Sequence, residues 1–71
     1  MDKELLRYYI KKNGDTAQSL SEYLGIRRQS LYQKMSETGS EFKLSEIRAI
    51  SKRYNLNAMQ MNEIFFNLEV S

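Results

Sequence analysis

The chain has 71 residues, with eleven basic and nine acidic side chains, and contains no cysteine and no histidine. This composition excludes disulfide bridges and the usual zinc sites, and a domain of this size buries only about 60% of the surface that its unfolded chain exposes. Because small domains without such cross-links often gain stability by oligomerising, we expect one domain, residues 1–71, that forms a homodimer.

The longest apolar run, Ile64-Phe65-Phe66, is far shorter than the roughly 20 residues that a membrane-spanning helix needs. Residues 1–4 do not resemble a signal peptide, so we expect a cytoplasmic protein without membrane contact. Residues 1–36 hold seven bases and four acids, whereas residues 37–71 hold four bases and five acids. A positive first half is typical of a surface that binds a polyanion, and it is equally compatible with a solvated surface carrying few charges.

The first predicted helix begins after Asp2, whose carboxylate can accept hydrogen bonds from the free N–H groups of a helix start. Its apolar residues recur at the spacing of one helix face: Leu5, Leu6, Tyr9 and Ile10. Two lysines in the last turn and Gly14 beyond them end this helix.

The second and third helices are predicted on either side of Gly25. Asp15 or Thr16 can cap the second helix, which is about nine residues long. Its inward face carries Ala17, Leu20, Ser21 and Leu24. The third helix spans residues 27–36. The residues that seat it on the core are Ile26, Leu31 and Met35.

A fourth helix is predicted from about Leu44 to Tyr54, and a short fifth helix follows the cap residue Asn57. The fourth helix has an apolar stripe formed by Phe42, Leu44, Ile47, Ile50 and Tyr54. The fifth has Met59, Met61, Ile64 and Phe65. From Phe66 to Val70, apolar and polar residues alternate as in a strand. We therefore expect a compact all-α domain of five helices with a short C-terminal extended segment.

The helices on either side of Gly25 each offer only a narrow apolar stripe, so they must pack across each other and against the first and fourth helices. This is the helix-turn-helix arrangement, predicted at residues 16–36, whose second helix projects far enough to enter a DNA major groove. Ser21 allows close approach of the two helices, and Gly25 permits the positive φ of the turn.

The exposed face of the third helix is rich in long hydrogen-bond donors. At about 100° per residue, Arg28, Gln29, Tyr32 and Gln33 span an arc of roughly 140°. Arginine can form two parallel bonds with guanine and glutamine two with adenine, so we expect these four residues to contact bases. Arg27 and Lys34 flank them, and we expect both to contact phosphates.

The segment TAQSLSEYLGIRRQSLYQKM, residues 16–35, resembles the helix-turn-helix of the phage-repressor and Cro type (the XRE family). Residues 41–57 are similar to the fourth helix of that family, and residues 62–67 to the endings of short phage regulators. The resemblance implies a lambda-repressor-like fold. Ser21 departs from the commoner alanine, and Arg27 replaces the usual Ser or Thr cap. Lys34 occupies a position that is often aromatic or aliphatic in the family, so we expect Met35 to take over that anchoring.

The resemblance also implies which residues contact DNA. It assigns base reading to Arg28, Gln29, Tyr32 and Gln33. Phosphate contacts come from the start of the second helix and from the segment after the third. On this chain those positions are Thr16, Gln18 and Ser36, with Ser40 or Lys43.

The sequence therefore predicts a transcription regulator that binds a palindromic double-stranded DNA operator, as a homodimer formed through the last helix and tail. For the tail, the alternative is that it folds back onto its own core. The alternative is a protein-interaction module, an antirepressor or adaptor that keeps the fold but contacts a protein. An enzyme would need paired carboxylates or an activated lysine, and nine acids spread over five short helices suggest no such pair. We expect no catalysis, cofactor, metal or small-molecule substrate.

Overall fold

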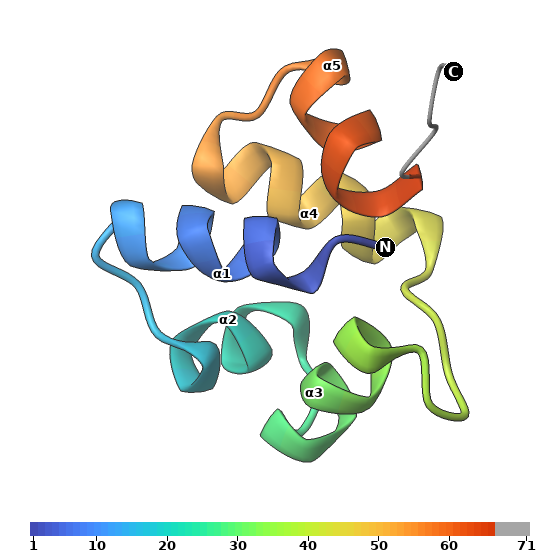
Figure 1. Cartoon of the computed structure of the whole chain (residues 1–71). Coiled ribbons are helices and arrows are strands. Elements are labelled where there is room, and N and C mark those ends of the chain that lie inside the picture. The colour runs from blue at the N-terminus through green and yellow to red at the C-terminus, as the bar shows by residue number, and fades with distance from the viewer. Residues whose placement is uncertain (67–71) are drawn as a thin grey trace.

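A computed structural model describes residues 1–66 of the chain. These residues form α1 (Lys3–Lys12), α2 (Ala17–Leu24), α3 (Arg28–Ser36), α4 (Leu44–Tyr54), α5 (Ala58–Met61) and a π-helical segment, η1 (Asn62–Phe66), that continues α5. In Figure 1, α1 lies between the α2–α3 pair on one side and α4 and α5 on the other. Residues 1–66 contain no strand, which confirms the all-α prediction.

The helix starts follow from local hydrogen bonding. Three helices begin with a side-chain oxygen that accepts the backbone N–H three residues later, from Asp2, Thr16 and Asn57. Thr16, rather than Asp15, is the cap of α2. No side chain caps α3, because Arg27 has no acceptor to offer the free N–H groups. The departure at Arg27 therefore leaves the start of α3 uncapped.

The core is shared by all the long helices. Five aliphatic side chains with no exposed surface come from α1, α2, α3, α4 and η1 in turn: Leu6, Leu20, Leu31, Ile50 and Ile64. The start of the chain is joined to its last described helix, since the Asp2 N–H donates to the Ile64 carbonyl at 2.7 Å. Since α1, α2, α3, α4 and η1 all contribute to one buried cluster, α3 is held at the surface by its packing against the rest of the domain.

Three predictions about apolar residues need correction. Leu44 is 59% exposed, because the first residue of α4 lies beyond the core that the later residues of its stripe enter. Met59, expected in the apolar stripe of the fifth helix, is 71% exposed and lies outside the core. Phe66, expected to begin an extended segment, lies in η1; the rest of that segment falls outside the described residues. No helix within residues 1–66 has the length and apolar character needed to cross a membrane.

Candidate nucleic-acid interface

The turn between α2 and α3 has the geometry that the sequence predicts. Gly25 has a φ of +72°, and its N–H donates to the Glu22 carbonyl at 3.1 Å. The Ile26 N–H donates to the Ser21 carbonyl at 3.0 Å, which completes a Schellman end for α2. Ser21 is buried, and its hydroxyl donates to the Gln18 carbonyl at 2.7 Å. The small residue and the left-handed glycine therefore fix the angle at which α3 leaves α2.

The two sides of α3 are chemically different. Leu31 and Met35 are buried in the core. The residues predicted to read bases are all exposed: Arg28, Gln29, Tyr32 and Gln33. They line one open, shallow depression together with four more residues: Gln18, Arg27, Ser36 and Thr38. The structure thus brings seven of the ten predicted contact residues to one surface. Thr38, for which the sequence predicted no contact, also lines this surface from the loop after α3.

This surface carries unpaired positive charge. Within residues 1–66, neither Arg27 nor Arg28 takes part in an ion pair. The nearest acid on α2 is Glu22, which accepts a hydrogen bond from the Gln18 amide at 3.1 Å. That bond directs the Gln18 nitrogen towards the carboxylate, because a carboxylate can only accept. Gln18 can therefore offer its second N–H and its oxygen to a ligand.

Lys34 contradicts the prediction that it contacts phosphate. Its side chain is buried, and its ammonium lies 3.0 Å from the Glu46 carboxylate and 3.3 Å from the Glu41 carbonyl. The angular position explains this result: at 100° per residue, Lys34 lies about 170° from the middle of the arc that Arg28 and Gln33 bound. It therefore faces α4, where a carboxylate receives it.

Two other predicted phosphate contacts are exposed but lie outside the depression. Thr16 caps α2, and its hydroxyl oxygen accepts the Ser19 N–H at 3.1 Å, which leaves the hydroxyl hydrogen free to donate. Lys43 precedes α4, and its backbone N–H donates to Glu46 at 2.8 Å while its side chain is exposed. Both positions can present a donor to an anion.

The turn before α2 is anchored to α4 by Asp15. Its carboxylate accepts hydrogen bonds from the Arg53 guanidinium at 2.7 and 3.1 Å, from the Tyr54 hydroxyl at 2.6 Å and from the Thr16 N–H at 2.9 Å. The Arg53 guanidinium also lies over the Tyr23 ring, 4.6 Å from its centroid. Asp15 therefore joins the start of α2, which holds two of the predicted phosphate contacts, to Arg53 and Tyr54 at the end of α4.

These contacts change how Asp15 and Tyr54 titrate. Hydrogen bonding from Arg53, reinforced by Tyr54 and the Thr16 N–H, lowers the pKa of Asp15 from 3.8 to about 2. Burial, together with the hydrogen bond to Asp15, raises the pKa of Tyr54 above its usual range. No local signal in the sequence indicates this cluster, because Arg53 and Tyr54 follow Asp15 by 38 and 39 positions.

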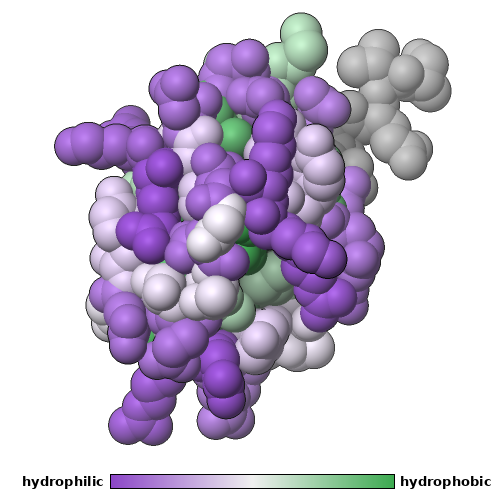
Figure 2. All heavy atoms as spheres, turned by 90° about the vertical axis from the view of Figure 1, so that its left-hand side faces the viewer, coloured by the Kyte–Doolittle hydropathy of each residue, from purple (hydrophilic) through white to green (hydrophobic). Residues whose placement is uncertain are grey.

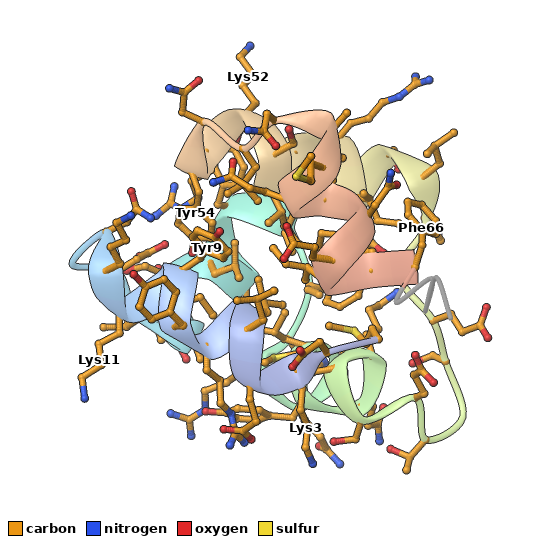
Figure 3. The ribbon with its side chains drawn as sticks, turned by 45° about the horizontal axis from the view of Figure 1, so that its top comes forward. Lys3, Tyr9, Lys11, Lys52, Tyr54 and Phe66 are labelled. Atoms are coloured by element: carbon orange, nitrogen blue, oxygen red, sulfur yellow. The ribbon has the colours of Figure 1, made fainter. Side chains whose placement is uncertain are left out.

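The figures place the anchor within the fold. Figure 3 shows Tyr54 pointing into the molecule, whereas Lys11 and Lys52 point away from it. The side of the molecule that carries the α1–α2 turn is covered mainly by hydrophilic residues, with small apolar areas between them (Figure 2). The Asp15 cluster is therefore a structural anchor on a polar side of the domain.

Comparison of the chain with protein-family models, with curated proteins and with solved structures gave no match in any of the three. In the part of the chain that the structure describes, no group of three or more acidic side chains is placed to hold a metal ion.

Proposed function

We propose that the chain is a sequence-specific transcription regulator that binds double-stranded DNA with α3 in the major groove. One observation carries the proposal: α3 exposes four long polar side chains along one arc, while Leu31 and Met35 are buried in the core. A helix placed in the major groove needs such a face, because bases are distinguished there by paired donors and acceptors. The absence of any acid from Arg27 to Lys34 suits a polyanionic partner.

The size of α3 argues for a dimer. Nine residues at 1.5 Å per residue give a helix of roughly 13 Å, which matches about four base pairs of a duplex with 3.4 Å between successive phosphates. So short a site is too common in a genome to be recognised alone. Two protomers related by a twofold axis would read half-sites about 34 Å apart. The exposed Met59 and Phe66 make the C-terminal region our choice for the contact between them.

Selection of bound sequences from a pool of random duplexes tests this proposal. We expect enrichment of a palindrome whose half-sites are about one helical turn apart, and binding that weakens steeply as salt rises. Gel shifts at two salt concentrations separate this from the protein-interaction alternative. A chain that enriches no sequence and binds no duplex at low salt would support the alternative instead.

A further inference from the structure

The ion pair between Lys34 and Glu46 joins α3 to α4 and is almost entirely out of water. Each residue is 8% exposed, and the charged atoms lie 3.0 Å apart. The same Glu46 oxygen accepts the Lys43 N–H at 2.8 Å, and the Lys34 ammonium also donates to the Glu41 carbonyl at 3.3 Å. The ammonium is therefore bound to the first turn of α4 and to the segment before it.

Stability is a poor explanation for this pair. Removing two charges from water costs several kcal/mol per ion, so buried pairs replaced by well-packed apolar residues often leave a protein equally or more stable. Leu31, about 60° from Lys34 around the helix axis, is fully buried and shows that an apolar side chain is accommodated on this side of α3. The pair does restrict the position of α3 relative to α4, because the Lys34 ammonium must stay within hydrogen-bonding distance of two acceptors.

The rotation of α3 about its own axis determines where its exposed side chains point. Leu31 and Met35 also constrain that rotation, but the hydrophobic effect has no preferred direction, whereas a hydrogen bond requires a defined distance and angle. A rotation of about 20° moves a side-chain tip about 6 Å from the axis by about 2 Å. Hydrogen bonds tolerate only about 0.5 Å, so a bidentate contact with a base would be lost.

We propose that the Lys34–Glu46 pair sets the rotation of α3 and thereby determines which bases its exposed face reads. Lys34 is thus a positioning residue, acting through Arg28, Gln29 and Gln33 without touching DNA. This inference rests on the proposed function. It predicts that the pair governs discrimination between sequences and leaves general attraction to DNA unchanged.

The test compares two double variants that each remove one positive and one negative charge. Lys34→Met with Glu46→Leu removes the buried pair without leaving an orphaned charge. Glu4→Gln with Arg7→Gln removes the exposed ion pair of α1, whose charged atoms lie 3.1 Å apart, and is the matched control. Affinities for the selected operator and for a scrambled duplex are measured by fluorescence anisotropy at several salt concentrations.

We expect the buried-pair variant to stay folded, to bind scrambled DNA with the wild-type affinity and salt slope, and to lose at least tenfold in its preference for the operator. The control should keep the wild-type preference. A buried-pair variant whose preference stays within twofold of wild type would overturn the inference. A loss of affinity equal on both duplexes would overturn it as well, since that is the result of a merely structural role.

Two further measurements keep the question decidable. Should the double variant fail to fold, Lys34→Arg is measured instead, since it retains the charge but places its donors differently. We expect its preference for the operator over scrambled DNA to fall threefold to tenfold. An unchanged preference would contradict the inference. Residual dipolar couplings report the orientation of α3 without DNA, and we expect a rotation of at least 10° in a folded variant. If the wild-type chain itself shows no sequence preference, the proposed function fails, while an α3 that does not rotate removes the positioning role.

Discussion

Replacement of Asp15 by asparagine tests whether the turn before α2 is held by charge. The pKa of Asp15 falls from 3.8 to about 2 in the folded protein, chiefly because Arg53 donates hydrogen bonds to it. That difference is equivalent to about 2 kcal/mol of folding free energy at neutral pH. The side chain is only 9% exposed, so solvent screening reduces this figure little. We expect Asp15→Asn to lower the free energy of unfolding by about 2 kcal/mol at pH 7.

The stability that Asp15 contributes should decrease as the pH falls. Because the folded pKa lies below the unfolded one, the contribution of Asp15 is complete above about pH 4 and is lost as the pH falls through 2. Tyr54 does not interfere in this range, since its pKa is raised and its hydroxyl stays neutral. Wild type and variant should therefore differ most at neutral pH and converge in acid.

Urea unfolding followed by circular dichroism, at intervals from pH 7 to pH 2, measures this difference. Glu63→Gln is the control, since Glu63 is exposed and forms no ion pair among the described residues. A difference between wild type and Asp15→Asn that stayed constant down to pH 2 would refute the reasoning. So would a difference at pH 7 below about 0.5 kcal/mol, the ordinary effect of a surface substitution.

Three further predictions follow from the proposed interface. Arg28→Ala or Gln29→Ala should each cost about 1–3 kcal/mol on the selected operator and relax its sequence, whereas equal losses on operator and scrambled DNA in gel shifts would argue against base reading. Lys43→Ala should weaken binding to all duplexes alike and flatten the plot of log affinity against log salt by about one unit per protomer, and an unchanged slope would remove Lys43 from the interface. Gly25→Ala should lower the free energy of unfolding by about 1–2 kcal/mol in thermal or urea unfolding. The cause is the φ of +72° at this position and not a clash, since an added Cβ would meet no neighbouring side chain or distant backbone within 4 Å. An unchanged stability would contradict this explanation of the turn.

Local chemistry was sufficient to predict much of the fold. Caps such as Thr16 and stops such as Gly25 act on their own turn of helix, so a single stretch of sequence reveals them. The limits of α4 were predicted in the same way, from an apolar stripe whose members from Leu44 to Tyr54 span the helix. The stripe did not reveal that Leu44, its first member within the helix, lies beyond the core, because burial depends on the neighbouring helices.

Contacts between distant residues were beyond the same reasoning. Nothing near Asp15 in the sequence indicates that Arg53 will reach it, and the place of Tyr54 in the apolar stripe of α4 does not indicate a partner for its hydroxyl. Lys34 was different, because its angle on α3 already placed it opposite the exposed arc. Lysine is usually exposed, so its residue type favours the surface, whereas the helical periodicity favours the buried position that the structure shows.

Four positive side chains of the chain fall into two groups, those that pair with a carboxylate inside the fold and those that do not. Lys34 faces the Glu46 carboxylate of α4, and Arg53 faces the Asp15 carboxylate in the turn before α2, so these two charges join parts of the fold to each other. Arg27 and Arg28 face solvent without an ion-pair partner among residues 1–66, so their charge is available to a ligand. Charge counted along the sequence consequently overstates what the surface offers to DNA. In the proposed complex, the internal pairs would supply the geometry on which sequence recognition depends, and the unpaired arginines would supply attraction and contacts.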